Sequence, residues 1–390
     1  MDEYKKLKNL IDEQKEGNDY LNSLNLHICN NDHENVIIIS KKFGKRVLFL
    51  TGRNAMRNLG FVRKYLDLFK KNGLEVTHFD NISSNPTLKE MEECVELAKN
   101  FKPDFIFALG GGSTIDTAKA ISLGLFGKIW DFVNKKSEIV DSIPIVASIT
   151  TLGTSSQVTP YAVITNTDTA EKKTVKSLRI LPKLSIADID IIKHAPKSIV
   201  SSAGFDMLCH CIEVYTRKEC SEIADIYLKE AFRLIGNNLI PSFKEDNPDY
   251  ILNMAYADIY AGIALSLIGT HVPHAISHPL SARFPEIKHG ESLAYVMPET
   301  CKLQIEKGDD QTKERFKEIS LMIGGDEDFN KTLQSFISNL DLKKNFRKFN
   351  KNEIDMITKD TLSYRKSSVE RSPVHFTEED IKHIITKSLE

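Results

Sequence analysis

Four side chains able to bind a metal form two pairs that lie far apart in the sequence. Asp206 and His210 are four residues apart in the segment GFDMLCHCIEVY, and His274 and His289 stand near the two ends of PHAISHPLSARFPEIKHG. Because residues four apart share one face of a helix, Asp206 and His210 can reach a single ion. One carboxylate with imidazole nitrogens suits Fe²⁺ or Zn²⁺ better than Ca²⁺ or Mg²⁺. The pattern therefore predicts a transition-metal site.

A run of histidines surrounds His274. If the helix continues past Pro273, His271, His274 and His278 share one face, and not all three need be ligands, since one can relay a proton or hold a neighbour. His289 stands at the start of the next predicted helix, where a loop can return it to the same ion. The histidines predicted to be ordinary surface or core residues are His27, His33, His78, His194, His375 and His383.

A glycine-rich turn is the second feature with chemical potential. The letters GGGS at 110–113 follow the apolar strand predicted at 105–109 and precede a helix that contains Asp116. Glycines let the backbone approach a ligand, and a helix N-terminus offers free N–H groups to a phosphate. We interpret the turn as a pyrophosphate site, although G-x-G-x-x-G is absent and a plain strand-to-helix turn is the alternative.

A hydroxyl-rich loop, TTLGTSS at 150–156, follows another predicted strand. Such loops are common in soluble proteins and carry little information alone. Open α/β sheets, however, bind ligands at the carboxyl ends of their strands. The loop is therefore a plausible lining for a cofactor.

Length and composition restrict the class of protein. At 390 residues the chain predicts two domains, and 41% hydrophobic with 27% charged residues predicts packed cores. A net charge of −2 without charge blocks disfavours nucleic acid and anionic membranes, which leaves small molecules as partners. The N-terminal segment lacks an apolar signal region, and the apolar runs are short, so we expect a cytoplasmic location. The six scattered cysteines are expected to stay reduced.

The order of predicted elements indicates the architecture. From Lys45 to about Asp190, short apolar strands alternate with amphipathic helices, which predicts a parallel sheet with helices on both faces. Beyond His194, helical periodicities follow one another. We therefore expect an α/β domain at 1–193 and an all-helical domain at 194–390. The last predicted helix begins after Thr377, an N-cap in T-x-x-D form.

Taken together, these motifs resemble the iron-containing (group III) alcohol dehydrogenase family. The segments that carry the resemblance are GGGSTIDTAKA, TTLGTSSQVTPYAVIT, GFDMLCHCIEVY and PHAISHPLSARFPEIKHG. Membership implies a dinucleotide-binding α/β domain, a helical metal-binding domain and a homo-oligomer, for which a dimer is expected.

The resemblance also implies roles for single residues. Asp206, His210, His274 and His289 match the metal ligands, and His278 matches a histidine that assists proton transfer. The expected cofactor-binding residues are Gly52, Arg53, Asn85, Gly111, Gly112, Ser113, Asp116, Thr150, Thr151, Thr154 and Lys172.

One departure from the family concerns the nucleotide. Where NAD-preferring members often carry an Asp after the first strand, this chain has Gly52 and Arg53. A 2′-phosphate meets no carboxylate there, and Arg53 can pair with it. NADP(H) is therefore at least as well suited as NAD(H).

The predicted activity is reversible hydride transfer between a nicotinamide and a small primary alcohol or aldehyde, with Fe²⁺, Zn²⁺ or Mn²⁺ as the Lewis acid. The alternatives are a glycerol-dehydrogenase-like polyol oxidoreductase, a dehydroquinate-synthase-type lyase and a nucleotide-binding protein without catalysis. The sequence does not identify the alcohol.

Overall fold

A parallel sheet organises the first half of the chain in the computed structural model, which describes residues 3–342 and 348–387. All neighbouring strands in this six-stranded sheet run parallel. The third and fourth strands in spatial order are buried along their whole length, as expected where helices cover both faces. In spatial order the strands are β1 (Leu26–Cys29), β8 (Leu184–Asp188), β5 (Ile145–Ile149), β4 (Phe105–Gly110), β2 (Arg46–Gly52) and β3 (Glu75–Ile82).

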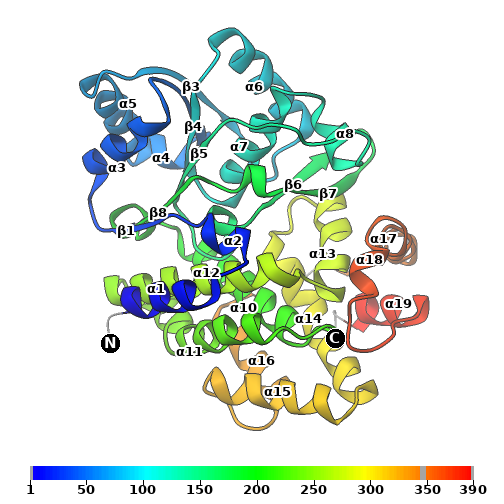
Figure 1. Ribbon diagram of the computed structural model, residues 1–390. Coiled ribbons are helices and arrows are strands. Elements are labelled where there is room, and N and C mark those ends of the chain that lie inside the picture. The colour runs from blue at the N-terminus through cyan, green and yellow to red at the C-terminus, as the bar shows by residue number, and fades with distance from the viewer. Residues whose placement is uncertain (1–2, 343–347, 388–390) are drawn as a thin grey trace. The chain divides into compact units, whose positions relative to one another are not determined.

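Helices cover both faces of the sheet (Figure 1). On one side, α3 (His33–Ser40), α4 (Ala55–Asn58) and α5 (Phe61–Lys71) enclose an aromatic core with Phe49 and Phe107. On the other side lie α6 (Leu88–Phe101), α7 (Gly112–Gly124) and α8 (Ile129–Val133). A capping box between Thr87 and Glu90 starts α6. The alternation of strands and helices expected from the sequence is confirmed.

Several elements in this part of the chain were not expected. An antiparallel hairpin of β6 (Tyr161–Asn166) and β7 (Glu171–Lys176) forms a two-stranded sheet separate from the main sheet. Strand β1 at the sheet edge was also missed, because it is short and partly exposed along its length. The remaining short elements are α2 (Asp19–Asn22), η1 (Lys41–Phe43), η2 (Ser156–Val158), η3 (Leu178–Ile180) and α9 (Ile189–Ile192).

The second half of the chain is helical, which confirms the predicted fold class. Helix α10 begins at Lys197 and contains the whole segment GFDMLCHCIEVY, and α11 continues through Pro241. Thr377 caps the last helix, since its Oγ1 accepts the N–H of Asp380 at 3.2 Å. The helices are α10 (Lys197–Tyr215), α11 (Glu222–Lys244), α12 (Pro248–Ile268), α13 (Val272–Arg283), α14 (His289–Lys307), α15 (Asp310–Met322), α16 (Phe329–Asn339), α17 (Lys351–Tyr364), α18 (Lys366–Val369) and α19 (Glu378–Lys387).

Helix α12 is long and apolar enough to cross a membrane, with a mean hydropathy of 1.5 over 18 residues. However, 72% of that window is buried within the structure, where α12 packs along α11. Asn247 caps its start, and Gly269 ends it in a left-handed conformation with φ +89°. The apolar character of α12 is therefore that of a core helix.

Two units are separable by their internal contacts. We call Lys8–Thr151 with Ser155–Ala195 the α/β unit. The helical unit comprises the residues up to Leu7, the segment Leu152–Thr154 and the chain from Pro196 onward. Helix α1 (Glu3–Gln14) precedes the sheet.

Candidate metal centre

Three helices of the helical unit bring the predicted metal ligands together. Helix α10 carries Asp206 and His210 one turn apart, α13 carries His274, and α14 begins at His289. From Oδ1 of Asp206, the Nε2 atoms of His274, His210 and His289 lie at 3.2, 3.6 and 3.7 Å. One carboxylate oxygen is therefore the point on which the four side chains converge.

The geometry of this cluster fits a divalent transition metal. Donor atoms of Asp206, His210 and His274 all lie within 4.8 Å of one another. The rings of His210 and His274 stack with their centroids 4.5 Å apart and an interplanar angle of 16°. Asp206 and His274 are buried, whereas the side chain of His289 is 28% exposed. Such oxygen and nitrogen donors can close around an ion that forms bonds of roughly 2.0–2.2 Å.

Electrostatics in the cluster favour a cation. Burial opposes ionisation of Asp206, but the surrounding histidines hold the pKa of its carboxyl below the usual range. Burial likewise disfavours a charge on His274, yet Glu213 and Asp206 raise its pKa to about 9. The buried carboxylates of Asp206 and Glu213 thus favour a protonated, positively charged His274 between them. A divalent metal would replace the proton of His274 that faces Asp206.

Glu213 is a functional candidate that the sequence analysis did not single out. It is fully buried on α10, and its Oε1 receives a hydrogen bond from Nδ1 of His274. Its Oε2 accepts the backbone N–H of His271 at 2.8 Å. A carboxylate on the far nitrogen of a ligating imidazole sets its tautomer and its orientation. The available signal was its spacing, three residues after His210 in GFDMLCHCIEVY.

The other two histidines of the run are placed differently. His271 precedes α13, its Nδ1 accepts the N–H of Val272 at 2.8 Å, and burial lowers its pKa to about 4. It therefore caps the helix and faces Glu213. His278 lies beside the cluster, with its ring centroid 5.5 Å from that of His289 and 6.0 Å from that of His274.

In the α/β unit, the glycine-rich turn lies next to Thr150 and Thr151, the first two residues of the threonine-rich loop. Gly111 is the N-cap of α7 and Gly112 its first residue. A methyl group added at Gly111 would come within 2.6 Å of Oγ1 of Thr151, so the glycine lets the turn and the threonine side chain pack closely. The N–H of Thr150 donates to the carbonyl of Gly110 at 3.1 Å. Both loops thus meet at the carboxyl edge of the sheet.

Two further predicted cofactor segments reach the same helix start. Oγ of Ser113 donates to the carbonyl of Ser84 at 2.5 Å, which holds the segment containing Asn85 against the turn. Gly52 ends β2, and a methyl group there would lie 4.0 Å from Oγ1 of Thr114. The glycine turn, Asn85 and Gly52 therefore come from three strand ends that share one edge.

Other predicted cofactor residues have different surroundings. The carboxylate of Asp116 accepts Oγ–H of Ser156 at 2.5 Å and N–H of Val163 at 2.9 Å, which ties α7 to the hairpin. Lys172 is buried on β7. Thr154 groups with the helical unit. A role in nucleotide binding for these three residues stays a prediction.

Comparison with known proteins identifies the family whose sequences and structures this chain matches. The model for iron-containing alcohol dehydrogenase matches residues 27–189, and the C-terminal model of the Fe-containing alcohol dehydrogenase family matches residues 200–389. A 1,3-propanediol dehydrogenase of Klebsiella pneumoniae is 30% identical over 286 residues, 72% of each chain. An NADPH-dependent butanol dehydrogenase of Clostridium saccharobutylicum is 28% identical over 313 residues, 77% of this chain and 78% of the relative. An archaeal halo-thermophilic alcohol dehydrogenase from a Red Sea brine pool, bound to NZQ, superposes with a TM-score of 0.89 at 31% identity, covering 94% and 97% of the two chains.

Proposed function

Because the chain belongs to the iron-containing alcohol dehydrogenase family, we propose that it reduces small aldehydes, and oxidises the matching primary alcohols, at one divalent metal in its helical unit. It is an oxidoreductase linked to a nicotinamide cofactor, and its substrates are small alcohols or aldehydes. The ligands we propose are Asp206, His210, His274 and His289.

The convergence of three imidazoles on Oδ1 of Asp206 carries this proposal. Asp206 and His274 are almost completely buried, and a buried carboxylate surrounded by imidazoles needs a compensating cation. A structural ion pair would need one histidine, whereas three helices each contribute at least one donor here. The arrangement is thus better matched to a metal than to a salt bridge.

The side chains around the centre have separate tasks in the proposed reaction. When bound, the metal supplies Lewis acidity to the substrate oxygen, and the nicotinamide supplies or accepts the hydride. Glu213 orients His274 by accepting the hydrogen bond from Nδ1 of that imidazole. His278 is positioned beside His289 to pass a proton between substrate and solvent. In the α/β unit, Gly111, Gly112 and the start of α7 would hold the pyrophosphate.

For the nucleotide we favour NADP(H). Arg53 follows β2 directly, its side chain is 52% exposed, and Nη2 donates to Oε1 of Glu90 at 2.8 Å. The guanidinium carries five N–H donors, so this pairing leaves others for a 2′-phosphate. The carboxylate of Glu90 is also held by Ser83 and by the backbone of Thr87. Glu90 therefore positions Arg53 at the end of the strand.

Replacement of Arg53 by Ala should raise KM for NADPH by roughly tenfold and change KM for NADH little, since a charge-assisted bond to phosphate is worth about 1.5–3 kcal/mol. Steady-state kinetics with both cofactors measure the effect. Arg63→Ala removes an arginine whose side chain is 92% exposed and serves as the control. An equal loss with both cofactors would contradict a 2′-phosphate contact.

Removal of metal tests the proposed function directly. After dialysis against a chelator, NAD(P)H-dependent reduction of a panel of small aldehydes should fall to background, and Fe²⁺, Zn²⁺ or Mn²⁺ should restore it. Elemental analysis before dialysis identifies the resident metal. Nucleotide binding, measured by quenching of protein fluorescence, should survive dialysis because the glycine turn proposed to hold the pyrophosphate lies in the α/β unit.

Two results would contradict the proposal. Undiminished turnover by metal-free protein would remove the Lewis-acid role. Nucleotide binding without turnover of any aldehyde, with metal present, would favour a non-catalytic protein. The homodimer and the cytoplasmic location stay predictions of the sequence.

A further inference from the structure

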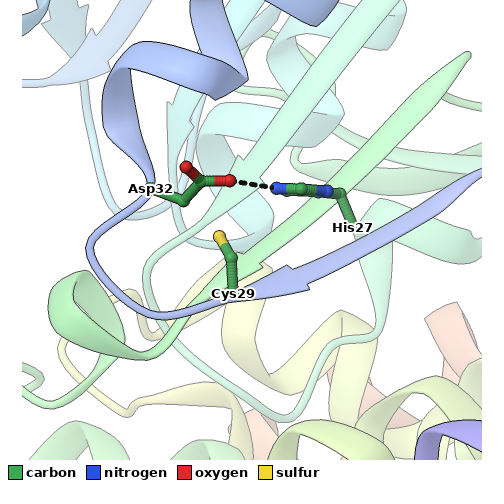
Figure 2. A group of neighbouring side chains, drawn as sticks. All are labelled: His27, Cys29 and Asp32. Atoms are coloured by element: carbon green, nitrogen blue, oxygen red, sulfur yellow. Dashed lines mark hydrogen bonds and ion pairs between the residues drawn. The ribbon is translucent and has the colours of Figure 1, made fainter.

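A second group of metal-binding side chains lies in the α/β unit. His27 and Cys29 come from the edge strand β1, and Asp32 comes from the turn that follows it. Figure 2 shows the imidazole, the thiol and the carboxylate directed toward one another. One donor atom from each side chain lies within 4.8 Å of the other two.

Local structure accounts for this arrangement. His27 and Cys29 are two residues apart on a strand, so their side chains share one face. Asn31 adopts a left-handed conformation with φ 58°, which reverses the chain and returns Asp32 over that face. The carboxylate of Asp188, at the end of the paired strand β8, accepts the N–H groups of Asn31 and Asp32 at 2.8 and 3.3 Å. The turn is thus held in place by the sheet.

We propose that His27, Cys29 and Asp32 form a binding site for Zn²⁺ or a similar thiolate-accepting transition metal. One imidazole, one thiolate and one carboxylate form a donor set that zinc accepts, with water as the fourth ligand. Bonds of about 2.0–2.3 Å place tetrahedral donors roughly 3.3–3.6 Å apart, so the 2.9 Å bond between His27 and Asp32 need open only slightly. The three side chains are partly exposed, which gives an ion access.

The surrounding charges favour a cation over a simple ion pair. Oδ2 of Asp32, the oxygen that contacts Nε2 of His27, also accepts Nδ2–H of Asn35 at 3.0 Å, so the carboxylate is held from two sides. A carboxylate oxygen of Asp32 lies within 4.8 Å of the Cys29 sulfur, and Asp188 stands opposite Cys29 on the paired strand. Two negative charges close to the thiol attract a divalent ion. On binding, sulfur gives its proton to solvent as the sulfur–metal bond forms.

Such an ion would add a bridge between the edge strand and the helix that follows it. Within residues 3–342 and 348–387, β1 is the edge of the sheet and pairs with β8, and α3 begins directly after Asp32. An ion held by His27, Cys29 and Asp32 would therefore fasten the edge strand to the start of α3. This role does not depend on the activity proposed above, because the residues belong to the α/β unit and the Asp206 centre to the helical unit.

Cobalt provides a selective test. The ligands proposed for the Asp206 centre carry only oxygen and nitrogen donors, so a sulfur-to-cobalt charge-transfer band would report a thiolate ligand elsewhere. Titration of metal-free full-length protein with Co²⁺ should produce this band, and Zn²⁺ should abolish it by displacement. The band should be absent in Cys29→Ser and present in Cys220→Ser, whose cysteine is also free but exposed. It should also persist in Asp206→Asn.

A second variant separates loss of metal binding from loss of the folded structure. Asp32→Asn keeps the shape of the side chain but removes its charge, and Zn²⁺ affinity should fall by more than about tenfold, since loss of an outer partner alone typically costs roughly 10- to 100-fold. Circular dichroism establishes that each variant is folded. The proposal is overturned if wild-type protein gives no band, if the band survives in Cys29→Ser, or if folded Asp32→Asn binds Zn²⁺ as tightly as wild type.

Discussion

Replacement of Asp206 by Asn is expected to remove the bound metal and to lower kcat/KM for aldehyde reduction by roughly three orders of magnitude, since metal polarisation is worth several kcal/mol. Oδ1 of Asp206 lies within 3.7 Å of Nε2 of all three proposed histidine ligands. An amide is neutral and binds metals weakly, although its shape is almost unchanged. The loss of metal and of activity should therefore come from removal of the negative charge and of the coordinating oxygen rather than from altered packing. Metal content and initial rates measure it.

The matched control is Asp246→Asn, the same chemical change at a side chain that is 91% exposed and pairs with Lys197. It should retain metal and activity. Nucleotide binding should be unaffected in both variants. If Asp206→Asn retained stoichiometric metal and turnover, the cluster on α10, α13 and α14 would not be the catalytic centre.

The parts of this centre that depend on one helix could be predicted from the sequence. Asp206 and His210 need only the geometry of a single turn to share a face, and GFDMLCHCIEVY reads as one helix. The glycine turn was equally accessible, because a buried strand, three glycines and a helix follow one another without interruption. Features of this kind depend only on the helix or strand that contains them, so they can be predicted without knowing how the elements pack together.

Contacts between elements could not be predicted in this way. The hydrogen bond of Glu213 to His274 joins α10 to α13, and no short window of sequence contains both residues. The group of His27, Cys29 and Asp32 was missed for a related reason, since Asp188 on another strand holds its turn. His27 was predicted to be an ordinary surface or core residue because nothing near it in the sequence indicates which strand β1 pairs with.

Gly290 shows how strongly the centre depends on one such contact. This residue follows His289 at the start of α14, and a methyl group added there would lie 1.8 Å from the backbone carbonyl oxygen of Ser202 on α10. Ser202 stands one turn before Asp206. The obstacle is backbone rather than a flexible side chain, so the helices themselves would have to separate. Glycine at this position is thus what lets His289 approach Asp206.

Gly290→Ala is therefore expected to destabilise the protein by about 3 kcal/mol, the upper end of overpacking costs, and to weaken metal binding by more than about tenfold. Thermal unfolding and metal titration measure the two effects. Gly324→Ala is the control, because its φ of +86° imposes strain but nothing lies within 4 Å of the added methyl. It should lower stability by only about 1 kcal/mol and leave metal affinity unchanged. Wild-type metal affinity in Gly290→Ala would show that His289 reaches the ion without close packing of α14 on α10. The proposal that this packing holds His289 in place as a ligand would then be wrong.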